Sequence, residues 1–554
     1  MCAIQISHDL EDWTEAPPPR NGAGPSRSPY SYLFPGLADV PDAGRFTGTD
    51  DDGTIQRLKD FEKACHLPNE RVSALTIDLP AAYTYFGQFL NHDISAPVGG
   101  LLQNPGDVRP LGIVGTVDLA GLGKDWRADV ATILRHFVNE HARPMTLASL
   151  YADGPGSSDL EVKALYQPDG SFRLARAYPV PIDILGESTK RPEAAIHARD
   201  APDIPRNGRI PLIADRRNDG NLILSQLHLA LLMFHNKAVK ALKARGTKAE
   251  DVFDEARQLV TRHYHWLILN DFLPSLLSKT VLAKPLSEWK PRPLPPGTVP
   301  MEFTTAAFRF GHSMVGRSYD FNANFGRGGA LENQATLQQL FNFTSDRNMG
   351  DPQGRIPQLP DHWVIDWDRL TRIKPPGDAA GASGLAERID LDFAPDMLND
   401  AGNARVLEHG SIFFRNLLRG FHRRIPFGQV LAKACGVPIL SRDELRAAMP
   451  QHQSLDSPYT DPADAAGALG ILEETPAWLY FLCEAQVLEQ GKRIGPTASQ
   501  IIADTVVSLM RNDPTSILRN GGGTWHPRDS LLQDLSCKPL DSLRAFLLFS
   551  SHGS

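Results

Sequence analysis

Three features of the sequence predict a mainly α-helical protein with long ordered loops and very little β-structure. Apolar residues recur at spacings of three and four in several long stretches. Strand-like alternation of apolar and polar residues is short and rare, and no internal repeat suggests a solenoid. The clearest predicted helices cover residues 221–244, 251–273, 410–418, 427–435, 477–490 and 497–511.

Residues that start or stop helices mark several boundaries. Gly246 follows the first long helix, as a C-terminal glycine commonly does. The second begins with acidic residues in DVFDEARQLV and is expected to stop before Pro274. Another helix is expected from about residue 76, with Pro80 in its first turn and AAYTYFGQFLNH following. A proline-rich, extended stretch at 280–300 precedes a further helix over EFTTAAFRFGHSMV.

Length, composition and charge bound the class of protein. A chain of 554 residues exceeds the usual size of one hydrophobic core, so length alone suggests several domains. Residues 1–45 are rich in Pro, Gly and Ser and are predicted to form an extended arm, with residues 46–554 as the main body. The net charge of −8, without a polybasic block, predicts no nucleic-acid partner. A membrane span is not expected either, because no apolar run reaches about 18 residues.

The N-terminus and the cysteines give expectations about location. The segment MCAIQISHDLEDW has no basic start followed by an apolar stretch, so we expect no secretory signal. The protein is then expected in the cytoplasm, or exported by a route that needs no such signal. The five cysteines are scattered without a CxxC pair and are predicted to be free thiols in a reducing compartment.

Two histidine-containing segments could carry chemistry. Gln88 and His92 in FGQFLNHD are four residues apart, so on a helix they lie on one face and could address one buried ligand. A partly exposed polar stripe is the alternative for this pair. His312 in AFRFGHSMV has Phe310 and Met314 nearby, where either an axial haem ligand or a satisfied core histidine would fit.

Two arginine-containing segments are further candidates. Arg216 and Arg217 in IADRRNDGN lie just before a helix N-terminus, where they could meet an anionic ligand or pair with the local acid Asp215. Asn416 and Arg419 in FFRNLLRG are three residues apart and share one face of a predicted helix. Each signal is weak by itself.

Taken together, the segments resemble the animal-type haem peroxidases, in the family's order and at compatible intervals over roughly residues 70–515. FGQFLNHD is similar to the distal helix, which usually reads FGQxxDHD, and ADRRND resembles the segment of the distal arginine. FRFGHS resembles the proximal-histidine motif, and FFRNLLRG resembles the segment that carries its asparagine partner. Bacterial-type members are the nearest likeness. The resemblance implies one large, mainly helical domain around a haem instead of several domains.

On the proximal side, the resemblance implies haem b as cofactor with His312 as the axial ligand of its iron. Asn416 would accept a hydrogen bond from the other ring nitrogen and hold the tautomer. Arg419 and Arg309 would pair with the haem propionates, because a guanidinium matches a carboxylate.

On the distal side, the resemblance implies peroxide chemistry. His92 would take a proton from hydrogen peroxide and return it to the leaving oxygen. Arg217 would stabilise the charge that builds as the O–O bond breaks, and Gln88 would hold a distal water or small anion. The implied substrates are hydrogen peroxide and a small organic reductant.

The sequence departs from the family where many relatives bind haem through ester bonds. Those relatives have an aspartate just before the distal histidine and a glutamate three residues after the distal arginine. Here the two positions hold Asn91 and Gly220, and neither forms an ester. Asp219 is one residue from the second position. Non-covalent haem is therefore expected, which argues against halide oxidation.

A calcium site is a second departure. Relatives use an aspartate directly after the distal histidine together with a loop of oxygen ligands, and Asp93 is in place here. The corresponding loop, RPMTLASLYADG, has Thr146 and Ala148 at the ligand positions. Because calcium takes six to eight oxygens, this site looks depleted.

Two alternatives remain open at this stage. A fatty-acid dioxygenase of the cyclooxygenase type would place a radical tyrosine three residues before the proximal histidine, where this chain has Arg309. A non-catalytic haem-binding protein is compatible with the missing ester residues. The presence of His92, Arg217 and Gln88 together favours catalysis over mere haem storage.

Overall fold

The computed structural model describes residues 28–65, 76–98, 127–136, 138–139, 141, 143–179, 196–344, 349, 356–373, 384–398, 411–453, 457–519, 525–536 and 539–551. Within these residues the chain is mainly helical, and its strands are short and form small sheets. The predicted fold class is thereby confirmed.

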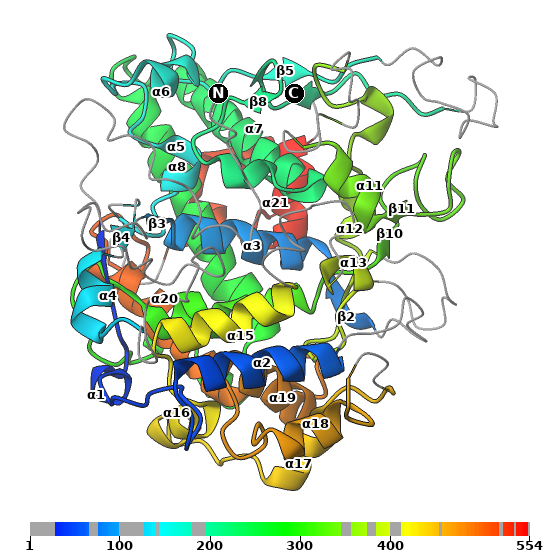
Figure 1. The fold of residues 1–554 in the computed structure, drawn as a ribbon. Helices are drawn as coiled ribbons and strands as arrows, with labels where there is room; N and C mark the ends of the chain where they lie inside the picture. The colour runs from blue at the N-terminus through cyan, green and yellow to red at the C-terminus, as the bar shows by residue number, and fades with distance from the viewer. Residues whose placement is uncertain are drawn as a thin grey trace.

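Helix α3 (Ala82–Ile94) occupies the centre of the fold. Figure 1 shows it running across the middle of the molecule, with α7 (Leu222–Arg245) above it and α15 (Ile412–His422) and α2 (Asp51–Cys65) below. Helix α3 packs against α7, and α15 packs against α2. Most side chains of α3 are buried, including those of His92 and Asp93, whereas Gln88 and Asn91 are half-buried.

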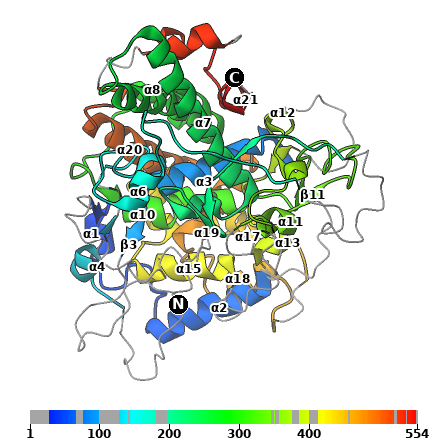
Figure 2. The same ribbon diagram turned by 90° about the horizontal axis from the view of Figure 1, so that it is seen from above.

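Helix α7 is the long helix that the apolar spacing predicted. It ends at Gly246, whose φ of 89° is the left-handed conformation expected of a helix-ending glycine. It packs against α8 (Val252–Leu267) and α21 (Leu543–Ser551), as Figure 2 shows. By length and composition it is the one helix among the described residues that could cross a membrane, which the sequence reading did not expect. However, 89% of that window is buried inside the fold, the environment of a core helix.

The prediction that the second helix stops before Pro274 was wrong. The chain continues from α8 into a π-helical turn, η5 (Ile268–Phe272), and then into α9 (Leu273–Leu276), with Pro274 in the first turn of α9. A proline inside a helix lacks an N–H donor and its ring crowds the preceding turn. The wider π-helical turn accommodates both effects, so the helix changes pitch instead of ending.

Two other predicted helices begin or continue differently. Residues 76–80 form strand β2 (Thr76–Pro80), which pairs antiparallel with β12 (Leu385–Glu387), and the helix starts only at Ala82. The alternating burial of this segment favours a strand over a helical turn. The predicted helix over EFTTAAFRFGHSMV is split into α10 (Met301–Thr305) and a 3₁₀ helix, η8 (Ala307–His312), because Ala306 leaves the helical conformation.

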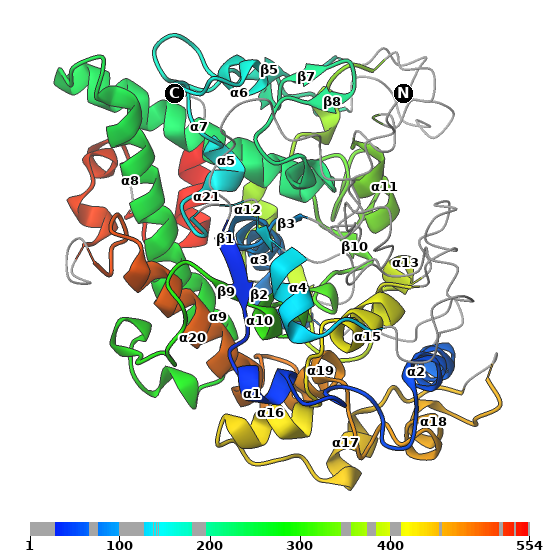
Figure 3. The same cartoon turned by 60° about the vertical axis from the view of Figure 1, so that its left-hand side comes forward.

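The C-terminal helices close the lower part of the fold. Helices α16 (Gly428–Ala434), α19 (Ala477–Glu489) and α20 (Pro496–Asn512) confirm three predictions, and α17 (Arg442–Ala448) and α18 (Pro462–Ala468) join them (Figure 3). A side chain at Gly428 would collide with Tyr480, so this glycine allows α16 to approach α19 closely. Helix α19 also packs against η8 and α15, the two elements that carry the predicted proximal residues.

Of the predicted arm, residues 28–45 are described and packed against the body. Strand β1 (Ser28–Ser31) pairs antiparallel with β4 (Val138–Asn139) and parallel with β9 (Val299–Pro300). The buried Tyr30 hydroxyl lies 2.8 Å from Ser95 Oγ, just beyond α3. The rest of the arm lies outside the described residues, so the domain boundary at 45 stays a prediction.

The remaining α-helices and strands of the described residues are short. They are β3 (Pro97–Val98), α1 (Pro35–Ala38), α4 (Val130–His136), α5 (Ala148–Tyr151), α6 (Leu160–Ala164), α11 (Leu337–Asn342), α12 (Trp367–Leu370), α13 (Pro395–Leu398), and the paired strands β5 (Ala175–Arg176) with β6 (Pro202–Asp203), β7 (Arg206–Asn207) with β8 (Ile210–Pro211), and β10 (Ser318–Tyr319) with β11 (Ala335–Thr336). Three of the five cysteines, Cys65, Cys435 and Cys483, are described, and they are free and buried as predicted.

Candidate active site

His92 lies on α3 at the centre of the fold and is 1% exposed. Its Nδ1 is 2.8 Å from Oδ1 of Asn218, a residue of the 3₁₀ helix η4 (Arg216–Asp219). Because a carbonyl oxygen can only accept, this contact places the ring proton on Nδ1. The neutral ring then carries its lone pair at Nε2, the form that a general base requires.

Arg217 lies beside His92, as the sequence predicted, and it also holds the end of α3. Its guanidinium donates to the carbonyl oxygens of His92 (3.0 Å) and Ser95 (2.9 Å). It also donates to the Asp215 carboxylate, with 2.6 Å between Nη2 of Arg217 and Oδ2 of Asp215. The last carbonyls of a helix lack partners within it and form the negative end of its dipole, so a cation stabilises them. This positioning contact was not foreseen from the sequence.

His141 is a second group on the His92 backbone that sequence reasoning missed. Its Nε2 lies 2.7 Å from the His92 carbonyl oxygen and 3.8 Å from Asp215 Oδ2. Burial lowers the pKa of His141 to about 4, so its ring is neutral at neutral pH. Burial would raise the pKa of Asp215, but the charge and hydrogen bonds of Arg217 outweigh it and hold that pKa below its usual range.

Gln88 connects the same face of α3 to helix α7. Its Oε1 accepts a hydrogen bond from Asn221 Nδ2 at 3.1 Å. Asn221 is also the N-cap of α7, since its Oδ1 accepts from the Leu224 backbone N–H at 2.9 Å. His92 and Gln88 are therefore each held by an asparagine of the segment 218–221, and Arg217, which precedes that segment, contacts the His92 carbonyl.

His312, the last residue of η8, meets Asn416 of α15 as predicted, but in the opposite sense. Asn416 Nδ2 lies 3.1 Å from His312 Nδ1, so the amide nitrogen and not its oxygen faces the ring. Asn416 Oδ1 instead accepts from Arg419 NH1 at 2.6 Å. The three-residue spacing on α15 causes this, because it places the Arg419 side chain next to the amide. Arg419 is 1% exposed.

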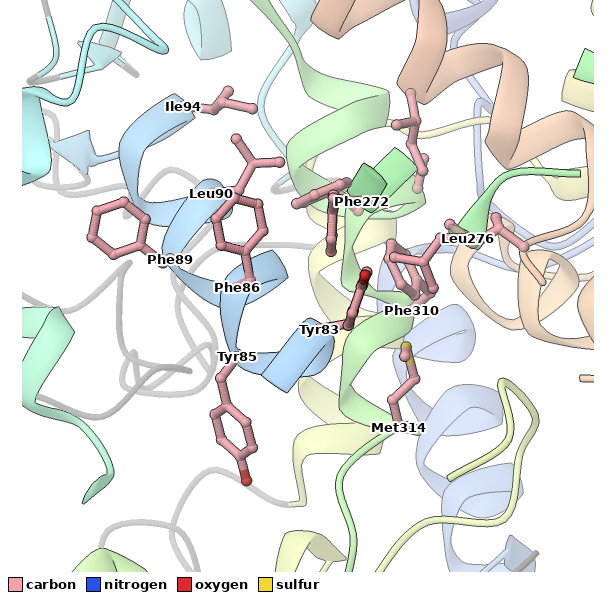
Figure 4. Close-up of a cluster of buried hydrophobic side chains, with 14 of the residues drawn as sticks. Tyr83, Tyr85, Phe86, Phe89, Leu90, Ile94, Phe272, Leu276, Phe310 and Met314 are labelled. Atoms are coloured by element: carbon pink, nitrogen blue, oxygen red, sulfur yellow. The ribbon is translucent and has the colours of Figure 1, made fainter. Parts of the chain in front are cut away.

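Arg309 is buried, and its Nε donates to the Thr304 carbonyl oxygen at 2.8 Å. The apolar residues that flank His312 belong to the core: Figure 4 shows Phe310 and Met314 in a cluster of buried side chains with Phe272 and Leu276. His312 thus has apolar chain neighbours and a polar partner on Nδ1.

Comparison with known proteins finds relatives in both sequence and fold. Residues 183–354 match the family model for animal haem peroxidase. Over 323 residues the chain is 25% identical to heme peroxidase 2 of Caenorhabditis elegans, a match that covers 54% of this chain and 39% of that protein. The fold is similar to that of peroxidase A from Dictyostelium discoideum, with a TM-score of 0.55, 15% identity, and coverage of 93% of this chain and 95% of the other. Residues 183–354 thus resemble the animal haem peroxidases in sequence, and the chain as a whole is similar in fold to a peroxidase.

The fold is also similar to fatty acid alpha-dioxygenase from Arabidopsis thaliana, with a TM-score of 0.52 and 13% identity, covering 91% of this chain and 79% of that one. The family match over residues 183–354 implies a haem cofactor. It does not by itself decide between peroxidase and dioxygenase chemistry, so the activity rests on the residues of this chain.

Asp219, the carboxylate next to the candidate ester position Gly220, is engaged by another side chain. Both carboxylate oxygens of Asp219 pair with Arg206, at 2.8 Å and 2.6 Å. The two side chains are almost fully buried, at 2% and 0% exposure. Asp219 is thus held by a buried ion pair that stabilises the turn carrying Arg217.

Breaking this pair is expected to be costly. Arg206→Met leaves the Asp219 carboxylate buried without its cation, and the free energy of unfolding should fall by about 3–5 kcal/mol. Urea denaturation of the single variant and of the Arg206→Met/Asp219→Leu double variant checks this, because the double variant removes the stranded charge. A single variant as stable as the parent, or no recovery in the double variant, would contradict the assigned pair.

In the candidate calcium loop, N–H and hydroxyl donors of the chain engage the Asp93 carboxylate. The Asp93 carboxylate accepts from the backbone N–H groups of Leu147 (3.1 Å) and Ser149 (3.3 Å) and from Ser149 Oγ. The carbonyl oxygen of Met145 lies 2.8 Å from His265 Nε2. Burial raises the pKa of Asp93 to about 6. Within the described ranges, no group of three or more His, Cys, Asp or Glu side chains is arranged around a metal position.

Calcium is therefore expected to have no effect on stability. A cation in hundredfold excess over its dissociation constant would add about 2.7 kcal/mol to the free energy of unfolding. Thermal melts with added calcium and with a chelator should give the same Tm. A Tm that rises with calcium concentration and falls on chelation would show that Asp93 still binds the ion.

Proposed function

We propose that this protein is a haem-dependent peroxidase that reduces hydrogen peroxide and oxidises a small organic donor. One observation carries the proposal. His92 has its Nδ1 against the amide oxygen of the buried Asn218, and Arg217 donates to its backbone carbonyl. His312 has its Nδ1 against the amide of the buried Asn416, which also contacts Arg419. A histidine, an asparagine and an arginine thus meet at two places in a fold similar to that of a peroxidase.

The residues on the proximal side fit a haem. His312 would ligate the iron of haem b through Nε2, which requires the proton on Nδ1. In that state the Asn416 amide must turn its oxygen toward the ring, and Arg419 must release it. A haem propionate would give Arg419 a charged acceptor in exchange, and Arg309 a second one. When bound, the haem supplies the electrons that cleave the O–O bond.

The distal residues supply proton transfer. His92 Nε2 takes the proton from one oxygen of hydrogen peroxide and delivers it to the other, which leaves as water. Arg217 provides positive charge close to the base and fixes the backbone of His92 through its carbonyl. Gln88, held by Asn221, would orient a water or a small anion in the same space.

Two alternatives are less well supported by the residues. A fatty-acid dioxygenase has structural relatives here, yet the position three residues before His312 holds Arg309, whose guanidinium is bonded to Thr304. A haem carrier without catalysis would not need a buried base whose tautomer is fixed by Asn218.

Steady-state assays distinguish these functions. The haem-loaded protein should oxidise a phenolic donor in proportion to added hydrogen peroxide, without consuming oxygen when a fatty acid is supplied. Oxygen uptake with a fatty acid and no peroxidase turnover would favour the dioxygenase. Neither activity, with haem fully bound, would favour the carrier.

The haem is expected to be held without ester bonds. Asn91 offers an amide, Gly220 has no side chain, and Asp219 is paired with Arg206. Acidified organic solvent should therefore extract the haem intact, because protonation of His312 breaks the axial bond and unfolding removes the packing. Haem that stays with the polypeptide through denaturing chromatography would contradict this.

A gain-of-function pair sharpens the extraction test. Gly220 has a φ of −72°, so the backbone accepts a glutamate there without strain. The Asn91→Asp/Gly220→Glu variant should become cross-linked to haem after exposure to peroxide, if the haem edge lies where the resemblance places it. The parent protein treated in the same way is the control and should release all its haem.

A further inference from the structure

We infer that Asn218 and His228 form a relay that sets the tautomer of His92 and so makes Nε2 the base. The inference rests on the proposed peroxidase function and adds two positioning residues to it. His228 lies on α7, and Asn218 lies between it and His92. Neither residue belongs to the set that the sequence resemblance pointed to.

The first link is the contact between Asn218 and His92. Asn218 is fully buried, and its Oδ1 lies 2.8 Å from His92 Nδ1. This geometry holds the proton on Nδ1 only while the amide keeps its oxygen toward His92. A rotation of the amide by half a turn would present a donor to Nδ1, move the ring proton to Nε2 and remove the base.

The second link holds the amide in place. Asn218 Nδ2 lies 3.1 Å from His228 Nδ1, so the amide donates to one histidine and accepts from the other. His228 is fully buried, and burial lowers its pKa to about 3, so its ring is neutral and can accept at Nδ1. Its Nε2 has no hydrogen-bond partner among the described residues. A buried polar ring kept for a single hydrogen bond indicates that this bond has a role.

Four charged or titratable residues from neighbouring segments surround His92. Asp215 and Arg217 come from the segment before α7, His141 from the segment after β4, and His228 from α7. Asp215 and Arg217 form a direct ion pair of 2.6 Å. Asn218 is therefore the group whose change alters His92 without adding or removing one of these charges.

The rate of cyanide binding to the haem reports whether His92 can accept a proton, and it does not require turnover of peroxide. Hydrogen cyanide must lose its proton to bind ferric haem, so its association rate follows the neutral fraction of His92 as pH rises. In Asn218→Leu the plateau rate should fall about tenfold, the effect of losing one hydrogen bond. The acid limb should also move to lower pH, because an acceptor on Nδ1 favours the charged ring.

Asn218→Asp provides the conservative rescue. A carboxylate also accepts from Nδ1, so the plateau rate should stay near that of the parent, while the acid limb moves to higher pH. His228→Leu, which frees the amide to rotate, should lower the plateau, and His228→Gln, which can still accept from the amide, should restore most of it. If Asn218→Leu does not retain haem, the comparison of His228→Leu with His228→Gln tests the relay.

The matched control is His235→Gln, on the same helix α7. His235 is also fully buried, with its Nδ1 3.0 Å from the Tyr151 hydroxyl, but it does not contact the Asn218 amide. Its cyanide profile should equal that of the parent. If the acid limb and the plateau rate of cyanide binding are the same in the parent and in all Asn218 and His228 variants, the relay is overturned, even if the protein turns over peroxide. Shifted cyanide profiles in a protein that never reacts with peroxide would keep the relay and overturn the proposed function.

Discussion

Replacing His312 by glycine is expected to abolish iron ligation and most haem binding while the chain remains helical. His312 is the residue of η8 whose ring meets Asn416, and its chain neighbours Phe310 and Met314 belong to the buried core. Removal of the axial ligand leaves only propionate pairing and apolar packing to hold a haem. Haem content per chain and the position of the Soret band measure the loss, and circular dichroism monitors the helices.

Added imidazole separates ligation from folding. A glycine at 312 leaves a space of the shape of the lost ring, so imidazole should restore a Soret band close to that of the parent. His263→Gln is a suitable control, because His263 is a buried histidine with a hydrogen bond to Ser530 and has no predicted role at the haem. Full haem content in the His312 variant, with an unchanged Soret band, would remove His312 from the axial position.

His92→Ala is expected to keep haem and lose most of the reaction with peroxide. General acid–base catalysis by a positioned side chain contributes about 10²–10⁴-fold, and the rate of the first step with hydrogen peroxide should fall by that factor. The variant also keeps the backbone carbonyl that Arg217 and His141 contact, so the end of α3 should stay in place. Stopped-flow absorbance in the Soret region measures the rate.

Two controls make the His92 result interpretable. Haem content of the variant must equal that of the parent, which excludes loss of the cofactor as the cause. The His263→Gln control should react at the parent rate. A parent-like rate in His92→Ala would show that another group moves the proton.

The sequence predicted the helical class and the long helices because their apolar spacing is a local property. It failed where tertiary context outweighs local preference. The segment at Pro80 forms a strand because β12 pairs with it, and a π-helical turn before Pro274 lets the helix continue past the proline. Ala306 interrupts a segment whose composition alone favours one continuous helix.

In the candidate site too, local motifs were predictable and contacts between distant segments were not. Motif spacing pointed to His92, Arg217, His312 and Asn416, and the structure brings each of them to a partner from another element. The contacts of His141, Asn218 and His228 join segments far apart in the chain, and no spacing rule signals them. Their roles, like those of the motif residues, remain to be measured.

The visible spectrum of the purified, haem-loaded protein, recorded before and after hydrogen peroxide is added, tests the central claim most directly. A haem peroxidase with His312 below the iron and His92 above it should show a ferric histidine-ligated Soret band. That band should shift within the mixing time of peroxide and return to its starting position when a phenolic donor is added. A protein that takes up no haem, or whose Soret band is unchanged by peroxide, would contradict the assignment.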